Sequence, residues 1–366
     1  MISISTSRFT VNPITRLALL LILLYVFFLS ISLMGASFKF FGKGFAERLL
    51  VTTANPFVGL FIGVLATSLV QSSSTITSMT VGLVAGGALD VSRAIPILMG
   101  SNIGTSVTNT LVAVGHISRP AEFKRAFAAA TVHDFFNLIS VLVLFPLQLA
   151  TGFLGTASTF LARELTGSSG LELINPLKRI VKPSVELITE LTSESGTLML
   201  IIALILLFVA LRYIVVNLKV LVLGRIEAFF HTALFKNAFR ALLLGLILTV
   251  LVQSSSIATS LTVPLAGAGI LTLRQIFPFT LGANLGTTIT AMLAALVTSN
   301  EDAVTVAFAH MLFNALGIVL IWLIKDAPLY LSETLAQWAV KSKIIPFAYV
   351  GVVFFLVPLA LIYFVG

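Results

Sequence analysis

Long, uninterrupted apolar runs alternate along this chain with shorter apolar segments that end at small polar clusters. The long runs lie at 14–35, 126–149, 197–216, 303–324 and 346–365, and about 20 apolar residues are enough to cross a bilayer as a helix. Because the runs are continuously apolar rather than alternating, they predict helices and not the strands of a barrel. We therefore expect an all-α polytopic membrane protein. The run 14–35 is longer than a signal-peptide core, so we expect it to be retained as the first span.

A cluster of four polar residues, Gln71 to Ser74, interrupts one of the most apolar stretches, and the same Gln-Ser-Ser-Ser sequence returns at Gln253 to Ser256. The apolar segments that flank these clusters are only roughly 11–15 residues long, too short to cross a bilayer alone. Polar groups at membrane depth are tolerated only when they are buried in protein or line a wet cavity. The pattern therefore predicts re-entrant hairpins at 57–88 and 239–270, and broken helices at 96–115 and 278–298.

The second half of the chain repeats the first. A shift of 182 positions aligns 63–114 with 245–296, and 23 of these 52 positions are identical. The Asn-Ile-Gly-Thr sequence from Asn102 to Thr105 meets Asn-Leu-Gly-Thr from Asn284 to Thr287. After a change of five residues in length, the cluster from His133 to Asn137 meets the one from His310 to Asn314. Three polar clusters that recur in one order are not expected from biased composition, so we interpret the chain as a duplicated unit.

We expect a first repeat at 1–149, an extracytoplasmic loop at 150–196, a second repeat at 197–325, and an amphipathic segment with a last span at 326–366. With a cytoplasmic N-terminus, thirteen Lys and Arg residues, Arg212 among them, fall on the cytoplasmic side and seven on the other, as the positive-inside rule favours. The two copies would then run in opposite directions. Inverted repeats with broken helices are typical of secondary transporters, whose sites lie near the midplane of the membrane.

Composition supports a membrane protein: 58% of the 366 residues are hydrophobic, 10% are charged, and the mean hydropathy is +1.09, against about 25% charged residues in soluble domains. The net charge of +8 could indicate nucleic-acid binding, but basic residues in short loops that orient the spans and meet anionic lipids explain it better. We therefore expect lipids, and not nucleic acid, as partners. The chain has no Cys, which excludes disulfide and thiol chemistry.

The polar clusters have the chemistry of an ion site. A helix that begins inside the membrane presents free N–H groups and a partial positive charge, and Ser hydroxyls and Gln amides add donors. Carbonyl, Gln, Asn and Thr oxygens at the other helix ends suit Na⁺, and the candidates are Gln71, Thr77, Asn102, Thr105, Thr108, Thr259, Asn284, Thr287 and Thr290. Neither 63–91 nor 245–273 contains Lys or Arg. We therefore hypothesise that bound Na⁺ supplies the positive charge beside an anion, and we expect no transition metal and no other cofactor.

Three further kinds of polar residue lie in the full spans. His133 and Asn137, like His310 and Asn314, are four residues apart and share a helix face, and we favour hydrogen bonding between helices as their role. Asp134 lies well inside a span. It could act in cation binding, as intramembrane acids often do, or pair with Arg119, Lys124 or Arg125.

The two Gln-Ser-Ser-Ser clusters, with the sequences at 94–113, 122–137 and 280–296, resemble those of type II sodium-dependent phosphate cotransporters. The resemblance covers most of 55–149 and 239–325 and fits a bacterial-type member. It implies a fold similar to divalent-anion/sodium symporters, with a scaffold and a mobile transport part, commonly in a homodimer. It also implies uptake of inorganic phosphate through the cell membrane, driven by Na⁺ entry and alternating access.

By matching position, the resemblance implies that phosphate is held by Gln71, Ser72, Ser73, Ser74, Gln253, Ser254, Ser255 and Ser256. It further implies a sodium site of Gln71, Thr287 and Thr290, with Thr105 and Thr108 as the mirror positions. The main alternative is a Na⁺-coupled symporter of another oxyanion or a dicarboxylate, such as sulfate, arsenate or a succinate-like anion. A serine hydrolase is disfavoured, because hydrolysis needs one asymmetric nucleophile–base pair whereas both serine clusters are duplicated.

Overall fold

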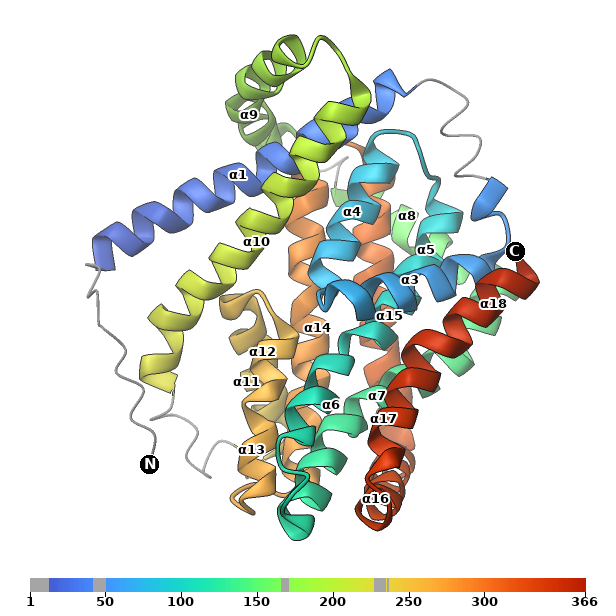
Figure 1. Ribbon diagram of the computed structural model, residues 1–366. Coiled ribbons are helices and arrows are strands. Elements are labelled where there is room, and N and C mark those ends of the chain that lie inside the picture. The colour runs from blue at the N-terminus through green and yellow to red at the C-terminus, as the bar shows by residue number, and fades with distance from the viewer. Residues whose placement is uncertain (1–12, 42–50, 166–170, 227–234, 236) are drawn as a thin grey trace.

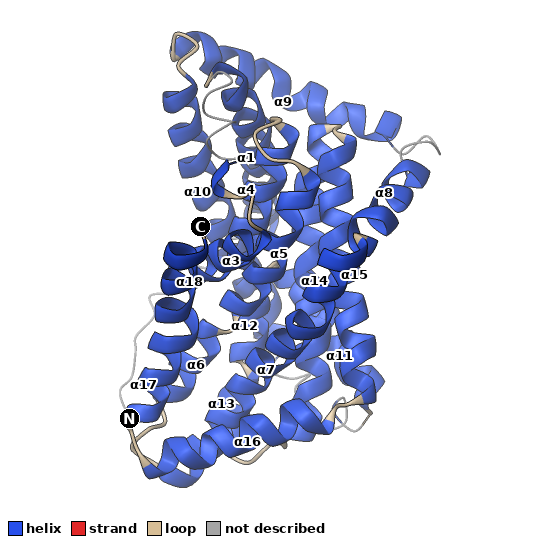
Figure 2. Cartoon of the chain, turned by 90° about the vertical axis from the view of Figure 1, so that its right-hand side faces the viewer, coloured by secondary structure: helices blue, strands red, loops and turns tan. Residues whose placement is uncertain are grey.

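The protein is helical throughout the part of the chain that the computed structural model describes, residues 13–41, 51–165, 171–226, 235 and 237–366 (Figures 1 and 2). Within these described ranges, six helices are long and apolar enough to cross a membrane: Thr15–Phe38, Pro120–Thr151, Gly196–Leu218, Leu273–Thr298, Glu301–Leu323 and Ile344–Val365. The predicted all-α polytopic membrane fold is confirmed. The opposite orientation of the two repeats remains a prediction.

In the first repeat, α1 (Pro13–Phe40) contains the predicted span 14–35. The predicted hairpin 57–88 consists of α3 (Pro56–Val70) and α4 (Ser73–Ala85), and the predicted broken helix 96–115 consists of α5 (Val91–Thr105) and α6 (Val107–Val114). The repeat ends with α7 (Pro120–Thr151), whose first residue is a proline, a residue that favours the first turn of a helix.

The second repeat begins with α10 (Gly196–Ile226). A hairpin of α11 (Ala238–Val252), α12 (Ser255–Ser260) and α13 (Thr262–Gly267) follows, then α14 (Leu273–Thr298) and α15 (Glu301–Leu323). Helices α3 and α11 have 15 residues each and are therefore about 22 Å long. They are too short for the hydrocarbon core of about 30 Å.

Paired glycines bring the hairpins close to the helices that follow them. A Cβ atom on Gly100 would lie 1.8 Å from the Leu60 carbonyl oxygen, and one on Gly282 would lie 1.8 Å from that of Leu242. A Cβ atom on Gly63 would lie 2.1 Å from the Ile97 carbonyl oxygen, and one on its counterpart Gly245 would lie 2.0 Å from that of Phe279. Small residues allow helix backbones to approach in this way. The duplication seen in the sequence therefore extends to the packing of α3 on α5 and of α11 on α14.

The copies differ in where their helices break. The predicted broken helix 278–298 is wrong: α14 is continuous from Leu273 to Thr298, whereas its counterpart breaks at Ser106. The position of Asn109, whose side chain is hydrogen-bonded to Thr259 beside the break, is taken by Ala291 in α14, so this contact has no counterpart in the second copy. Conversely, α4 is continuous while its counterpart is interrupted at Leu261. Pro264 explains this break, because proline removes the hydrogen bond to the residue four positions earlier.

The segment predicted as a loop at 150–196 contains two helices, α8 (Phe153–Leu165) and α9 (Leu171–Leu191). Helix α9 packs against α1 and α14, and α8 packs against α15. Helices α1 and α10 pack along each other at one side of the structure (Figure 1). The largest apolar core cluster joins this pair to α4, α9 and α14, with Phe27, Leu33, Met34 and Leu207 among its buried members.

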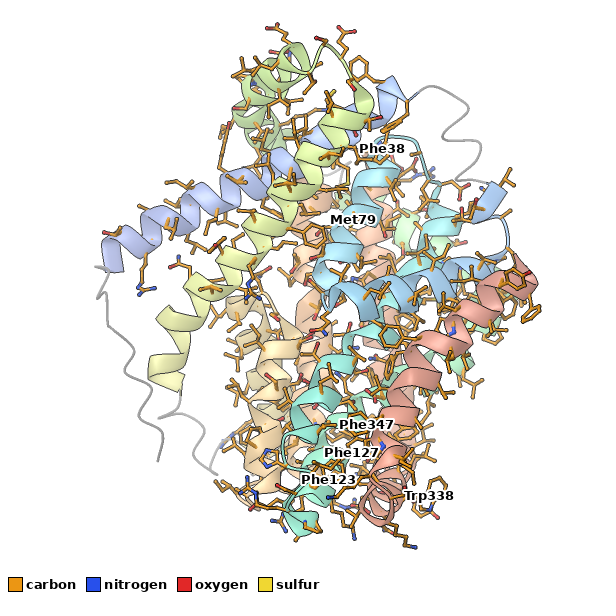
Figure 3. All side chains as sticks on the ribbon, viewed as in Figure 1. Phe38, Met79, Phe123, Phe127, Trp338 and Phe347 are labelled. Atoms are coloured by element: carbon orange, nitrogen blue, oxygen red, sulfur yellow. The ribbon has the colours of Figure 1, made fainter. Side chains whose placement is uncertain are left out.

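The chain ends in α16 (Asp326–Lys341), α17 (Ile344–Gly351), a π-helical turn (Val352–Leu356) and α18 (Val357–Val365). Helix α16 packs across one end of α7. Phe123 and Phe127 are buried there, with ring centroids 5.2 Å apart, and Trp338 is exposed nearby (Figure 3). An exposed Trp at the end of a helical bundle suits the membrane–water interface.

Candidate functional site

The two Gln-Ser-Ser-Ser clusters lie in one cavity of about 580 Å³, although they are 182 positions apart in the chain. Both hairpin tips, Gln71 to Thr75 and Gln253 to Ile257, line the cavity, together with Val70 and Thr108. The rest of the lining comes from one stretch of α10: Phe208, Val209, Leu211, Arg212, Tyr213 and Val215. The wall therefore has a polar side made by the tips and a largely apolar side made by α10.

Each tip has the same backbone geometry. Gln71 and Gln253 end their helices in the left-handed region, with φ of 56° and 55°, which is uncommon for residues other than glycine. The next residues, Ser72 and Ser254, are extended N-caps whose side chains accept a hydrogen bond from Thr75 N–H and Ile257 N–H. The chain thus reverses at the tip and starts a new helix at once.

This reversal leaves donors free in the cavity wall. The first N–H groups of a helix have no partner within that helix, and the N-cap serine of α4 accepts only from Thr75. The amides of Ser73 and Ser74 at the start of α4 are therefore available, and those of Ser255 and Ser256 occupy the same positions in α12. Together with the positive end of the helix dipole, they make the tips favourable to an anion.

The serine side chains have different surroundings. Ser73 and Ser255 line the cavity and are only 4% and 2% exposed. The Ser256 hydroxyl donates to the Thr105 carbonyl oxygen at 3.3 Å, so it links the second tip to the end of α5. Gln253 donates from Nε2 to the Val250 carbonyl oxygen at 2.6 Å and accepts at Oε1 from Thr290 at 2.7 Å.

The threonines expected around Na⁺ make the following contacts, and the sodium site that the resemblance implies stays a prediction. Thr290 donates to Gln253, of its own copy, and Thr287 donates to the Ala283 carbonyl oxygen at 3.2 Å. Neither hydroxyl is hydrogen-bonded to Gln71. Thr105 likewise donates within its helix, to Ser101, whereas the Thr108 hydroxyl is buried without a partner among the described residues and lies at the cavity.

Two other threonines stand one turn into the helices that start at the tips. Thr77 donates to the Ser74 carbonyl oxygen at 3.2 Å. Thr259 donates to Ser255 at 2.7 Å, and its hydroxyl accepts from Asn109 Nδ2 at 2.8 Å. The contact between Asn109 and Thr259 is a second direct link between the copies, beside that of Ser256 with Thr105.

The histidines and asparagines of the full spans form one buried network behind the tips. His133 Nε2 donates to Asn284 Oδ1 at 3.0 Å, and His310 Nε2 donates to Asn102 Oδ1 at 3.3 Å. Asn284 Nδ2 donates in turn to Asn137 Oδ1 at 3.0 Å and to Asn314 Oδ1 at 2.6 Å. All six side chains are at most 1% exposed. This arrangement is the hydrogen bonding between helices that we favoured for these residues.

Asp134 is completely buried and is not paired with a basic residue. Its Oδ2 accepts from the Tyr349 hydroxyl of α17 at 2.8 Å, and Ser106 and Thr110 lie beside it at the break between α5 and α6. The basic residues considered as its partners lie elsewhere: Arg119 pairs with Glu122, Arg125 donates to the Ala266 and Gly267 carbonyl oxygens, and Lys124 is exposed.

The sequence did not associate Arg212 and Tyr213 with the tips. It placed Arg212 among the cytoplasmic basic residues, whereas the structure places it in the candidate span Gly196–Leu218 and at the cavity. No motif surrounds it, and only the packing of α10 beside the tips reveals it. Among the described residues no group of three or more His, Asp or Glu side chains could hold a metal ion, so the candidate cation ligands remain amide, hydroxyl and carbonyl oxygens.

Comparison with known proteins places the chain in a family. The family model described as Na⁺/Pi-cotransporter matches residues 26–164 and 206–341, which is well over half of the chain and includes both tips. The chain belongs to the Na⁺/Pi-cotransporter family. The matched residues take in the cavity, the network behind it and helix α16.

Curated relatives in this family include sodium-dependent phosphate transport protein 2B of Homo sapiens, 32% identical, and protein 2A of Oryctolagus cuniculus, 34% identical. The alignments cover 94% and 96% of this chain. They cover 64% of the human protein and 67% of the rabbit protein. The chain therefore spans about two thirds of the length of these relatives. No solved structure matches the chain.

Proposed function

We propose that this protein is a secondary active symporter that couples Na⁺ entry to the uptake of inorganic phosphate by alternating access. The observation that carries the proposal is that both Gln-Ser-Ser-Ser tips line the same cavity. Membership of the Na⁺/Pi-cotransporter family supports the identity of the two ions, and the names of the relatives state sodium-dependent phosphate transport for those proteins.

The chemistry of the tips fits a tetrahedral oxyanion. Phosphate has four oxygens, and the two tips offer backbone amides, serine hydroxyls and glutamine amides from two directions. Hydroxyls can both donate to an oxyanion and accept from a protonated phosphate oxygen. We assign phosphate to Gln71, Ser72, Ser73, Ser74, Gln253, Ser254, Ser255 and Ser256 on this basis.

Na⁺ prefers oxygen ligands, and oxygens at or beside the tips include those of Gln71, Gln253, Thr290, Thr108 and Thr105. A cation held there would lie close to the anion. Binding of one ion then favours binding of the other, which is the requirement for coupled transport. A hydrolytic role is disfavoured, because the serines come as a duplicated set, whereas nucleophilic catalysis needs one activated serine beside a base.

Alternating access requires the tips to face each side of the membrane in turn. Helices α1 and α10 pack chiefly along each other, and we assign them to the scaffold against which the hairpins move. We further propose that the protein works as a homodimer in the cell membrane, as the resemblance implies.

Uptake of radiolabelled phosphate into proteoliposomes tests the proposal. We expect uptake with an inward Na⁺ gradient and none when K⁺ or H⁺ replaces Na⁺. Arsenate should compete, whereas sulfate and succinate should not. Uptake that is independent of Na⁺, or competition by succinate that equals competition by arsenate, would contradict phosphate symport and favour the broader anion alternative.

A further inference from the structure

The cavity between the tips has a single charged side chain in its described lining, Arg212 of α10. The other side chains that α10 contributes are apolar, apart from the phenol of Tyr213. The tips contribute only neutral groups. The one full positive charge at the site therefore comes from a helix that carries no part of the duplicated motif.

The guanidinium group of Arg212 is exposed and makes no ion pair or hydrogen bond with any residue in the described part of the chain. A charged side chain inside a span is costly, and such residues usually face a wet cavity and serve function. Arg212 thus has the position and the free donors of a ligand-binding residue.

The charge of Arg212 and the neutral donors of the tips come from helices that pack mainly against different neighbours. Helix α10 (Figure 1) packs mainly along α1 and makes only slight contact with α4 and α11. Arg212 and the tips nevertheless line the same cavity. The backbone amides and hydroxyls of the tips can hold both monovalent and divalent phosphate. A fixed cation distinguishes the two, because its attraction scales with the charge of the anion.

The resemblance to type II sodium-dependent phosphate cotransporters implies that the divalent form is favoured, and we propose that Arg212 is the specificity-determining residue that completes the anion site and produces this preference. This inference rests on the proposed phosphate transport and deepens it. A guanidinium group can donate two parallel hydrogen bonds to phosphate oxygens. The sequence alone suggested that Na⁺ supplies all of the positive charge beside the anion. With Arg212 at the same cavity, Na⁺ and the Arg212 guanidinium group would share that role.

Kinetics in proteoliposomes test the inference with wild type, Arg212→Gln, Arg212→Lys and the control Arg240→Gln, which removes an exposed charge on α11 outside the cavity. At pH 8, where divalent phosphate dominates, Arg212→Gln should raise the KM for phosphate about tenfold or more, the loss expected for a charged hydrogen-bond donor. At pH 6 the increase should be much smaller. Arg212→Lys should retain the pH profile of wild type, and Arg240→Gln should match wild type.

The absence of cysteine allows a second test in which the fold is held constant. Arg212→Cys introduces the single thiol of the chain, and aminoethyl methanethiosulfonate adds a positive charge there, whereas methyl methanethiosulfonate adds none. The cationic label should restore a low KM at pH 8, and the neutral label should not. This comparison is made on the same folded variant, so it decides the role of charge even if Arg212→Gln is unstable.

Two outcomes would overturn the inference: an Arg212→Gln KM equal to that of wild type at both pH values, or equal restoration by both labels. In either case Na⁺-dependent uptake by wild type would leave the proposed function standing. Absence of Na⁺-dependent phosphate uptake by wild type would instead refute the proposed function.

Discussion

His133 of the first repeat donates its Nε2 hydrogen to Asn284 Oδ1 of the second at 3.0 Å, inside the helical bundle. The reciprocal bond, from His310 to Asn102 Oδ1, is 3.3 Å long. Each copy thus binds a helix of the other that also contacts a Gln-Ser-Ser-Ser tip, since Thr290 of α14 donates to Gln253 and Thr105 at the end of α5 accepts from Ser256. The two tips are positioned by an exchange of hydrogen bonds between the copies, and not by either copy alone.

Asn284 is the most connected member of this network, with one hydrogen bond accepted and two donated. Asn284→Ala should lower the free energy of unfolding by about 1–3 kcal/mol, the cost of leaving buried polar groups without partners. Asn102→Ala should cost less, because the Asn102 side chain makes only one strong bond of this kind. Thermal unfolding in detergent measures both, and equal effects would argue against the network.

Ser73→Ala and Ser255→Ala should each raise the KM for phosphate by about tenfold or more, since a hydrogen bond to a charged group contributes about 1.5–3 kcal/mol. Both serines line the cavity and are nearly buried. Ser78→Ala is the matched control, because Ser78 is buried in α4 outside the cavity and its hydroxyl has no described partner. Unfolding temperatures should stay close to wild type, and wild-type uptake by both cavity variants would contradict the site.

Thr290→Val tests the cation site, because it removes the hydroxyl that donates to Gln253 while keeping the shape of the side chain. We expect the Na⁺ concentration for half-maximal uptake to rise about three- to tenfold, the range for one net hydrogen bond, with little change in the KM for phosphate at saturating Na⁺. Thr280→Val serves as control, since Thr280 is buried in the same helix and donates only to its own Ile276 carbonyl oxygen. An unchanged Na⁺ dependence of Thr290→Val would remove this residue from the cation site.

Gly100→Ala should prevent correct packing of α3 on α5, because the new methyl group would lie 1.8 Å from the Leu60 carbonyl oxygen. Overpacking costs about 1–3 kcal/mol and more when the clash is with backbone, so we expect little folded protein by size-exclusion chromatography. Gly282→Ala should behave alike, with the Leu242 carbonyl oxygen at the same distance. Gly351→Ala, in open space, should fold as wild type; a well-folded Gly100→Ala protein would contradict the close approach.

Asp90, the N-cap of α5, lies outside the candidate membrane spans and should make the stability of the fold depend on pH. Partial burial raises the pKa of its carboxyl, but hydrogen bonds from the Ser92 hydroxyl and Arg93 N–H and the charge of Arg93 outweigh burial and hold the pKa below the ordinary value of 3.8. The carboxylate therefore stabilises the fold above this value, and the contribution is lost as the pH falls through the lowered pKa.

Asp90→Asn keeps a good N-cap but removes the charge. The Asp90 side chain is 44% exposed, so the contribution that the variant loses at pH 7 should be under about 1 kcal/mol. Unfolding temperatures measured from pH 6 to 3 should fall less steeply for the variant than for wild type. An equal slope would show that Asp90 is not the group responsible.

The sequence by itself determined the helical membrane fold, the duplication and the two tips. Continuous apolar runs leave no other way to satisfy backbone hydrogen bonds in lipid, and each Gln-Ser-Ser-Ser cluster lies at a break between two short helices. These are local effects, and residues adjacent in the chain carry them.

Only the tertiary structure decided which side chains meet. It continued α14 through the position where its counterpart breaks, joined Asp134 to Tyr349 of α17, and placed the Thr290 hydroxyl against Gln253. It also brought Arg212 to the cavity. The periodicity of a helix shows which residues share a face, but the neighbour of that face depends on how distant helices pack, and no local pattern records it.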